Sequence, residues 1–269
     1  MGRFPERARG CDGGVMKTRI IQTAHTRSST DSVRLSSVSK VYGSGDTSVA
    51  ALRDVSLGLA RGSFTAVMGP SGSGKSTFLH CAAGLDRPTT GTVHLGDVEI
   101  SGLGEDALSR LRRERIGFVF QSFNLVPSLT AEQNITLPLR LAKRRTDTGW
   151  LNEVTQRVGL GQRSKHKPAE LSGGQQQRVA IARALIARPE VIFADEPTGA
   201  LDTRTGKDIL TLLREAVDGL GQTVVMVTHD PNAAAHADTV VLLADGQIVE
   251  EIDNPSSELV AERMTHLGD

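Results

Sequence analysis

The nine residues from Gly69 to Thr77 combine three glycines, one lysine and four hydroxyl side chains, a set that can hold a chain of phosphates. They fit the pattern G-x-x-x-x-G-K-[ST], in which glycines let the backbone approach an anion and direct its N–H groups toward it. Lys75 supplies a positive charge for the β- and γ-phosphates, and Ser76 supplies a hydroxyl oxygen for Mg²⁺. We therefore predict nucleotide binding at Gly69, Pro70, Ser71, Gly72, Ser73, Gly74, Lys75, Ser76 and Thr77.

The segments on either side of this loop have the character that the motif requires. The apolar run from Phe64 to Met68 predicts a buried strand, and residues 75–83 predict a helix that stops at Gly84. A helix that begins in the loop adds unpaired N–H donors and a favourable dipole for an anion. A glycine-rich turn without a ligand would match the same letters, but it would not need a strand before it and a helix after it.

Polar residues follow three further apolar segments that are expected to be strands. Gln121 follows residues 116–120, Asp195 and Glu196 follow residues 191–194, and His229 follows residues 223–227. Alternating strands and helices predict a mainly parallel sheet with helices on both faces. Ligands bind at the carboxyl ends of the strands in such a sheet. These side chains are therefore expected to meet around the phosphates held by Gly69 to Thr77.

The chemistry of these side chains suits phosphate hydrolysis. Asp195 suits Mg²⁺, Glu196 suits a general base that activates water, and His229 could hydrogen-bond a γ-phosphate. Each also has a simpler explanation, as a carboxylate that ends a strand, a solvated glutamate and a histidine at the edge of the core. Their convergence on one edge is what favours the functional interpretation.

Composition narrows the class of protein. Lys+Arg and Asp+Glu both number 31, so the zero net charge gives no reason to expect nucleic acid as a partner. Cys11 and Cys81 lie far apart, which argues against a disulfide and fits a reducing, cytosolic compartment. No apolar run approaches the roughly 18 residues of a membrane span, and no secretory signal is recognisable. If the protein works at a membrane, another chain is expected to cross it.

The order of segments predicts one large domain after a tail. Residues 1–30 are basic and poor in large apolar residues, so we expect a disordered tail; Met16 is an alternative start. Residues 33–38 and 49–59 predict strands of an antiparallel layer. Tyr42 lies between them, where it either packs or stacks on a nucleotide base. The basic end of a helix over residues 105–113 is expected to be a solvated face.

Residues from about 122 to 187 predict a helical subdomain inserted into the α/β core. Capping boxes open helices at Thr130 and Ser172, and Pro138 is expected to kink or interrupt the first of them. The segment from Gln121 to Leu141 is expected to couple nucleotide binding to a membrane partner. Its apolar residues Leu125, Val126 and Leu129 either pack internally or form part of a partner surface.

With Leu171-Ser172-Gly173-Gly174-Gln175 added, this set of motifs resembles the ATP-binding-cassette (ABC) ATPase family over about residues 32–250. The resemblance implies a P-loop NTPase core with an antiparallel β layer and an inserted α-helical subdomain, within a domain of residues 31–269. It implies ATP and Mg²⁺ as cofactors and a head-to-tail dimer. In that dimer, Ser172, Gly173, Gly174 and Gln175 would bind the ATP held by the other chain.

The resemblance also implies roles for single residues. Tyr42 matches the aromatic residue that stacks on adenine, and Gln121 matches the glutamine that touches Mg²⁺ and senses the membrane partner. Asp195 and Glu196 match the Mg²⁺ aspartate and the catalytic glutamate, and His229 matches the switch histidine. Residues 199–202, ending in Asp202, match the loop that crosses to the other subunit.

Residues 118–125 and 195–202 look like those of macrolide-export and lipoprotein-releasing cassettes. This finer resemblance implies the ATPase subunit of an exporter or extractor, peripheral on the cytoplasmic face of the cell membrane. Its partners would be a transmembrane permease and a second cassette. The alternative classes are a soluble ABC ATPase that acts on nucleic acid or ribosomes and a mechanical, non-transporting complex.

Overall fold

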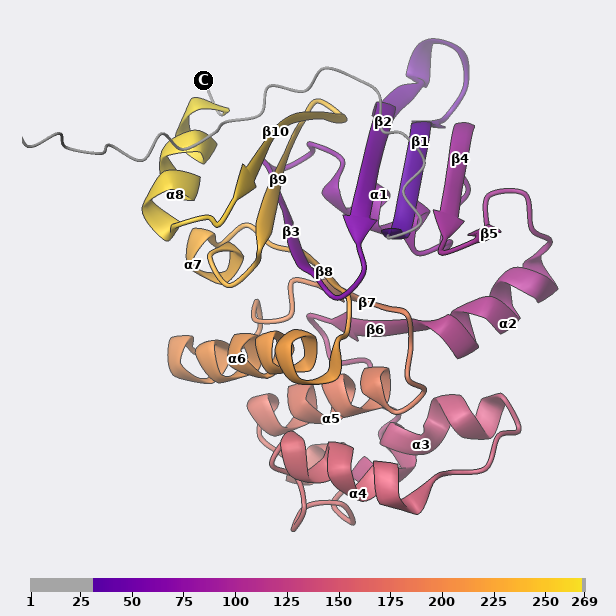
Figure 1. Cartoon of the computed structure of the whole chain (residues 1–269), viewed down its shortest axis with the longest axis vertical. Coiled ribbons are helices and arrows are strands. Elements are labelled where there is room, and N and C mark those ends of the chain that lie inside the picture. The colour runs from indigo at the N-terminus through magenta and orange to yellow at the C-terminus, as the bar shows by residue number, and fades with distance from the viewer. Residues whose placement is uncertain (1–30, 268–269) are drawn as a thin grey trace, which may run out of the picture.

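Two β-sheets organise the chain in this computed structural model, which describes residues 31–267 (Figure 1). The disordered tail predicted for residues 1–30, with Cys11 and Met16, lies outside the described residues. The first sheet is antiparallel, in the order β2-β1-β4-β5, and confirms the predicted antiparallel layer. Its strands are β1 (Asp31–Tyr42), β2 (Val49–Ala60), β4 (Thr90–Leu95) and β5 (Val98–Glu99).

The second sheet has the order β10-β9-β3-β8-β7-β6 and is parallel except for its β10 edge. Strands β3 and β8 are buried along their whole length, which explains why they are unbroken apolar runs rather than alternating ones. The strands are β3 (Phe64–Met68), β6 (Ile116–Phe120), β7 (Val191–Asp195), β8 (Val224–Val227), β9 (Thr239–Ala244) and β10 (Gln247–Asp253).

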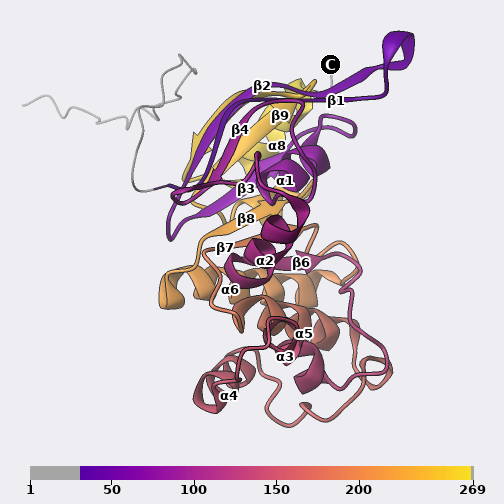
Figure 2. The same cartoon turned by 90° about the vertical axis from the view of Figure 1, so that its right-hand side faces the viewer.

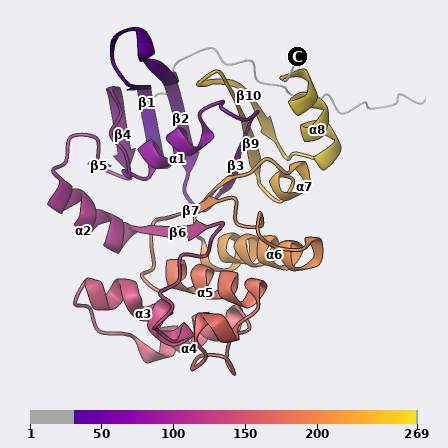
Figure 3. The same ribbon diagram turned by 180° about the vertical axis from the view of Figure 1, so that it is seen from behind.

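Helix α1 (Lys75–Ala82) lies between the two sheets (Figures 1 and 3). Its buried residues Phe78 and Leu79 belong to one apolar cluster with Leu35 of the antiparallel sheet and with Val67 and Val225 of the parallel sheet. Helices α5 (Gly173–Leu185) and α6 (Thr203–Leu220) cover the opposite face of the parallel sheet through a second cluster. The predicted sheet with helices on both faces is thereby confirmed.

Helices α3 (Ala131–Leu141) and α4 (Thr148–Arg157) occupy the far end of the molecule, beyond α5 (Figures 1 and 2). The Thr130 capping box forms as predicted, but α3 runs without interruption through Pro138 to Leu141. Pro138 lies in the last turn of the helix. Its missing N–H costs one backbone hydrogen bond, but less than one turn of helix follows it, so the helix is not interrupted. The remaining elements are η1 (Gly45–Thr47), α2 (Glu105–Arg115), η2 (Pro168–Glu170), α7 (Pro231–Ala234) and α8 (Ser257–His266). Within residues 31–267, no helix is both long and apolar enough to cross a membrane.

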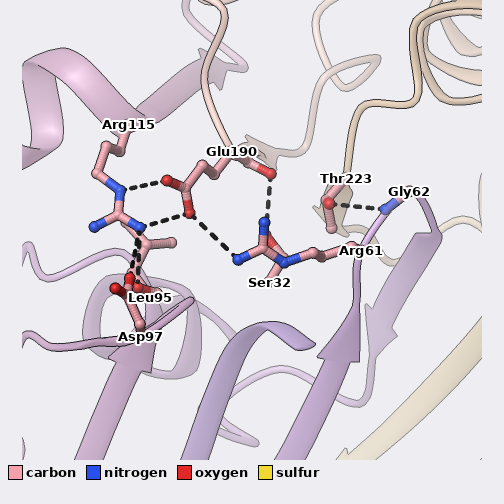
Figure 4. Close-up of polar contacts among 8 residues, drawn as sticks. All are labelled: Ser32, Arg61, Gly62, Leu95, Asp97, Arg115, Glu190 and Thr223. Carbon is pink, nitrogen blue, oxygen red and sulfur yellow. Dashed lines mark hydrogen bonds and ion pairs between the residues drawn. The ribbon is translucent and has the colours of Figure 1, made fainter. Parts of the chain in front are cut away.

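One carboxylate, that of Glu190, joins segments of the two sheets (Figure 4). Glu190 directly precedes β7, so it lies at the edge of the parallel sheet where its parallel strands begin. Its Oε2 lies 2.8 Å from Nη2 of Arg115, at the end of α2, and 4.0 Å from Nη2 of Arg61, in the turn between β2 and β3. The Glu190 carbonyl accepts a hydrogen bond of 3.0 Å from the Ser32 hydroxyl of β1. The hydrogen bonds that Arg115 donates to the Glu190 carboxylate raise the pKa of the Arg115 guanidinium.

We expect Glu190→Gln to lower the free energy of unfolding, because it removes the negative charge shared by two arginines. The side chains of Glu190 and Arg115 are 29% and 24% exposed, so the effect should lie between that of a surface and a buried pair, about 1–2 kcal/mol. Urea titration followed by circular dichroism measures it. The matched control is Glu153→Gln, which breaks an exposed pair with Arg157 on α4 and should change stability by less than about 0.5 kcal/mol. Equal effects of the two changes would contradict the assignment.

Candidate functional site

The ends of four adjacent strands form one row across the parallel sheet. Phe120 pairs with Asp195, Asp195 pairs with Val227, and Val227 pairs with Val67. The residues just beyond this row include Gln121, Glu196 and, after Met68, the phosphate loop. The polar segments that the sequence places at the ends of β3, β6, β7 and β8 therefore lie at one edge of the parallel sheet.

Two glycines of the loop are required by close contact with other backbone segments. Gly69 has a φ of +156°, and a Cβ added to it would lie 2.0 Å from the Leu243 carbonyl oxygen of β9. Gly74 has a φ of +101°, and its Cβ would lie 2.3 Å from the Ala51 carbonyl oxygen of β2. A side chain at either position would clash with this backbone, so the loop can keep its shape only with glycine at both positions.

Lys75 and Ser73 are prepared for an anion by their surroundings. The Lys75 ammonium donates hydrogen bonds to the carbonyls of Gly69 and Pro70 at 2.9 and 2.8 Å. Burial lowers the pKa of Lys75, and the charge of Glu196 acts against that shift. The buried hydroxyl of Ser73 has no hydrogen-bond partner among residues 31–267. A phosphate group would satisfy both side chains.

Glu196 and His229 contact each other directly. Oε1 of Glu196 lies 2.8 Å from Nδ1 of His229, and the two side chains are 19% and 74% exposed. Glu196 has a φ of +47°, and its N–H donates to the Val227 carbonyl at 2.9 Å. A positive φ is uncommon for a non-glycine residue, and such residues cluster at active sites.

Gln121 lies against the loop that follows Glu196. A Cβ added to Gly199 would lie 2.7 Å from Nε2 of Gln121, so a side chain at this position would displace the Gln121 amide. Asp202, at the end of that loop, caps α6 by accepting a hydrogen bond of 3.0 Å from the Thr205 N–H. Hydrogen bonds from the Thr205 side chain and from its N–H lower the pKa of Asp202.

Oxygen donors suited to Mg²⁺ are present at Ser76, Gln121 and Asp195. No group of three or more acidic, histidine or cysteine side chains in the described part of the chain forms a metal cage. Mg²⁺ in nucleotide sites is commonly held by one or two carboxylates together with phosphates and water, so a single carboxylate suffices. Burial raises the pKa of Asp195, because its charged form lacks solvation, and a cation beside it would offset that cost. The residues present therefore fit Mg²⁺ bound with a nucleotide.

The residues of Leu171 to Gln175 lie at the N-terminus of α5. Ser172 caps this helix in the predicted capping box, with Gln175 N–H donating to Ser172 Oγ at 3.3 Å and Ser172 N–H donating to Gln175 Oε1 at 3.0 Å. Gly174 packs on α6, where its Cβ would lie 2.3 Å from Thr205 Cγ2. Helix α5 lies on one side of β6 and β7, and α1 lies on the other (Figures 1 and 3). Two helix N-termini that suit anions thus occupy different parts of one chain.

Gln177 of α5 was not identified from the sequence. Its side chain is fully buried, and its amide donates to the carbonyls of Phe120, just before Gln121, and Pro197, just after Glu196. The signal that could have found it is a glutamine on the buried face of α5, in helical phase with Gly174 and Ile181.

The fold and this edge define a P-loop ATPase, and the comparisons identify its family. The family model described as ABC transporter matches residues 52–199. An uncharacterised ABC transporter ATP-binding protein of Methanocaldococcus jannaschii is 46% identical over 225 residues, which cover 81% of this chain and 96% of that protein. The chain therefore belongs to the ABC transporter family, as an ATP-binding and ATP-hydrolysing subunit.

A solved structure of that relative and one further protein bear on its function. A solved dimer of the ATP-binding cassette MJ0796, in a post-hydrolysis state bound to ADP and Pi, has a TM-score of 0.75 at 44% identity. The match covers 83% of this chain and 99% of that one. The macrolide export ATP-binding/permease protein MacB of Hyphomonas neptunium is 46% identical over 227 residues. The match covers 82% of this chain and 35% of MacB, so the chain spans about a third of that relative. The predictions of fold class and ATPase activity are confirmed.

Proposed function

We propose that this chain is the ATPase of an exporter or extractor complex, at the cytoplasmic face of a cell membrane, and that it drives a transmembrane permease. The single row of strand ends that gathers the phosphate loop, Gln121, Asp195, Glu196 and His229 carries the proposal. Similarity to MacB, which is named as a macrolide export protein, supports the export type. We do not expect the chain to bind nucleic acid.

In the proposed site, residues 69–77 hold the ATP phosphates, and Tyr42, 41% exposed at the end of β1, stacks on the adenine. Lys75 moves its ammonium from the Gly69 and Pro70 carbonyls to the phosphate oxygens. Ser76, Asp195 and Gln121 hold Mg²⁺, which neutralises charge on the phosphates when it is bound. The Glu196 carboxylate accepts a proton from the attacking water. His229 donates either to that carboxylate, 2.8 Å from its Nδ1, or to the γ-phosphate, because a neutral imidazole carries a single N–H.

A second copy of the chain completes each site. Ser172, Gly173, Gly174 and Gln175 present a hydroxyl and helix N-terminal N–H groups, but on the other side of β6 and β7 from α1. A head-to-tail dimer places these residues of one copy over the ATP held by the other. Asp202 and the loop before it lie between the two sites in this arrangement. The relative MJ0796 is itself described as a dimer.

The permease is proposed to dock in a groove between α2, β6, α3 and α5. This groove has a volume of about 470 Å³, and the most exposed residues on its apolar wall are Leu85 and Leu141, 42% and 57% exposed. Residues from about 122 to 187 act here as the helical subdomain. Leu125, Val126 and Leu129 do not line the groove, and Leu125 packs against the core. The apolar lining residues of the groove are Leu85, Ile116, Phe118, Phe120, Leu137, Pro138, Leu141, Ala184 and Ala187.

Three arginines on the groove wall favour a permease segment with acidic or carbonyl oxygens. Arg112 and Arg113 were expected on a solvated face, yet both line the groove with Arg183. Within residues 31–267, their guanidinium groups bond to carbonyl and hydroxyl oxygens rather than to carboxylates. Burial lowers the pKa of Arg183, which an acidic partner would reverse.

Glu196→Gln tests the general base. The amide keeps the size of the side chain and can still contact His229, but it cannot accept the proton of water. We expect ATP hydrolysis to fall by roughly 10²- to 10⁴-fold while ATP binding persists and the ATP-bound dimer accumulates. Phosphate release and size-exclusion chromatography with ATP measure both effects. Normal turnover of the variant would show that another residue is the base.

A mixture of two inactive variants tests the shared site. Chains with Ser172→Arg keep a working phosphate loop, and chains with Lys75→Ala keep a working Ser172. Random pairing makes about half of the dimers mixed, and each mixed dimer has one intact site of two, so about a quarter of the activity should return. A Lys75→Ala/Ser172→Arg chain mixed with Lys75→Ala should restore none. Normal hydrolysis by the Ser172→Arg homodimer would exclude action across the dimer.

Polar changes in the groove test permease docking. Leu85→Ser and Leu141→Ser alter exposed side chains, so the isolated subunit should keep its stability and its ATPase activity. Co-purification with the co-expressed permease, and stimulation of ATPase activity by it, should fall at least about tenfold, since apolar groove contacts dominate such interfaces. Val249→Ser on β10, 46% exposed and outside the groove, is the matched control. If docking survives the two groove changes, the permease binds elsewhere.

A further inference from the structure

The carboxylate of Asp86 holds both Tyr42 and Lys40. The Tyr42 hydroxyl donates a hydrogen bond of 2.7 Å to Oδ2 of Asp86, and the Lys40 ammonium donates one of 2.6 Å to Oδ1. The same ammonium lies 4.9 Å from the centroid of the Tyr42 ring, close enough for a cation–π contact. We call Lys40, Tyr42 and Asp86 the tyrosine cluster.

The tyrosine cluster is attached to the helix that forms the phosphate site. Asp86 follows α1, and its N–H donates to the His80 carbonyl of α1 at 3.1 Å. The end of β1 is tied to the same loop, because Lys40 donates to the Arg87 carbonyl at 2.7 Å and Thr89 N–H donates to the Ser39 carbonyl at 2.7 Å. The distance between the Tyr42 ring and the start of α1 at Lys75 is therefore set by a continuous set of contacts.

Packing does not account for this arrangement of the ring. Tyr42 is 41% exposed, so burial of its ring contributes little to the core. The ring is nevertheless held at its hydroxyl by Asp86 and on one face by Lys40, which leaves the opposite face for a planar ligand. Holding a side chain in its bound orientation before binding removes part of the entropy cost of ordering it.

The charges of the tyrosine cluster are balanced. Partial burial disfavours the charged form of Asp86, but the hydrogen bonds from Lys40 and Tyr42 outweigh it and hold the pKa of this carboxyl below its usual range. Burial and the hydrogen bond to Asp86 raise the pKa of the Tyr42 phenol, with the Thr77 hydroxyl acting against them. The phenol thus keeps its proton and donates a hydrogen bond to Asp86, so its O–H group is not free to donate to a base edge.

We infer that Asp86, with Lys40, is a positioning residue that fixes the Tyr42 ring for stacking on the purine base of ATP. The inference rests on the proposed contact between Tyr42 and adenine. It adds that the ring is oriented before ATP arrives, and that Asp86 affects binding of the base and not of the phosphates.

Titrations with MgATP and with magnesium tripolyphosphate, which has no base, separate these two contributions. Tyr42→Ala should weaken ATP binding by about 5- to 100-fold, the range for loss of one base stack. Tyr42→Phe keeps the ring but loses its hydrogen bond, and Asp86→Ala removes the acceptor; each should weaken ATP binding by about 3- to 10-fold. Tripolyphosphate affinity should stay within about twofold in all three variants, because the phosphate loop is unchanged.

Two further variants sharpen the test. Tyr42→Phe combined with Asp86→Ala should bind ATP no more weakly than the weaker single variant, since both remove the same hydrogen bond. Glu105→Gln is the matched control, because it removes a carboxylate that pairs with Arg87 in the same loop, at 3.3 Å, without touching Tyr42. This control should bind both ligands as the unaltered chain does.

The outcomes distinguish failure of the inference from failure of the proposed site. Equal weakening of ATP and tripolyphosphate binding by Asp86→Ala would give Asp86 a general structural role and overturn the inference. Unchanged ATP binding by Tyr42→Phe and Asp86→Ala, with weakened binding by Tyr42→Ala, would overturn the inference and leave the adenine contact standing. Unchanged binding by Tyr42→Ala would overturn the adenine contact and with it the inference.

Discussion

The close approach of the phosphate loop to backbone from both sheets is the constraint on which the site depends. The Leu243 carbonyl of the parallel sheet contacts Gly69, and the Ala51 carbonyl of the antiparallel sheet contacts Gly74. Directly after the second contact the chain enters α1, whose apolar residues fill the space between the sheets. The direction in which the N-terminus of α1 points is therefore determined by the packing of both sheets and by the absence of two Cβ atoms.

The row of strand ends brings further polar side chains in line with this single helix terminus. Parallel register places the residue after β6 and the residue after β7 in line with the end of β3, because the pairs Phe120–Asp195, Asp195–Val227 and Val227–Val67 follow one another. A shift of one residue in any of these pairings would turn alternate side chains to the other face of the sheet. Buried apolar side chains on both faces of these strands prevent such a shift.

Local sequence patterns predicted the elements and the edge, since each depends on residues close in the chain. The strand, loop and helix around Gly69 to Lys75 and the capping boxes at Thr130 and Ser172 formed as predicted. Contacts between distant segments were not predictable in this way. The bond between Tyr42 and Asp86 joins residues 44 positions apart, and the groove wall draws residues from four elements. Which of its two possible uses Leu125 serves likewise depends on tertiary packing, and the structure places it against the core.

The buried amide of Gln177 gives the molecule a mechanical property. It connects the backbone at the end of β6 to the backbone beyond Glu196, and both connections start from one residue of α5. Displacement of either loop relative to α5 must stretch or break a hydrogen bond that water cannot replace, at a cost of about 1–3 kcal/mol. The Gln177 side chain therefore limits how far the two loops can move apart before this link is lost.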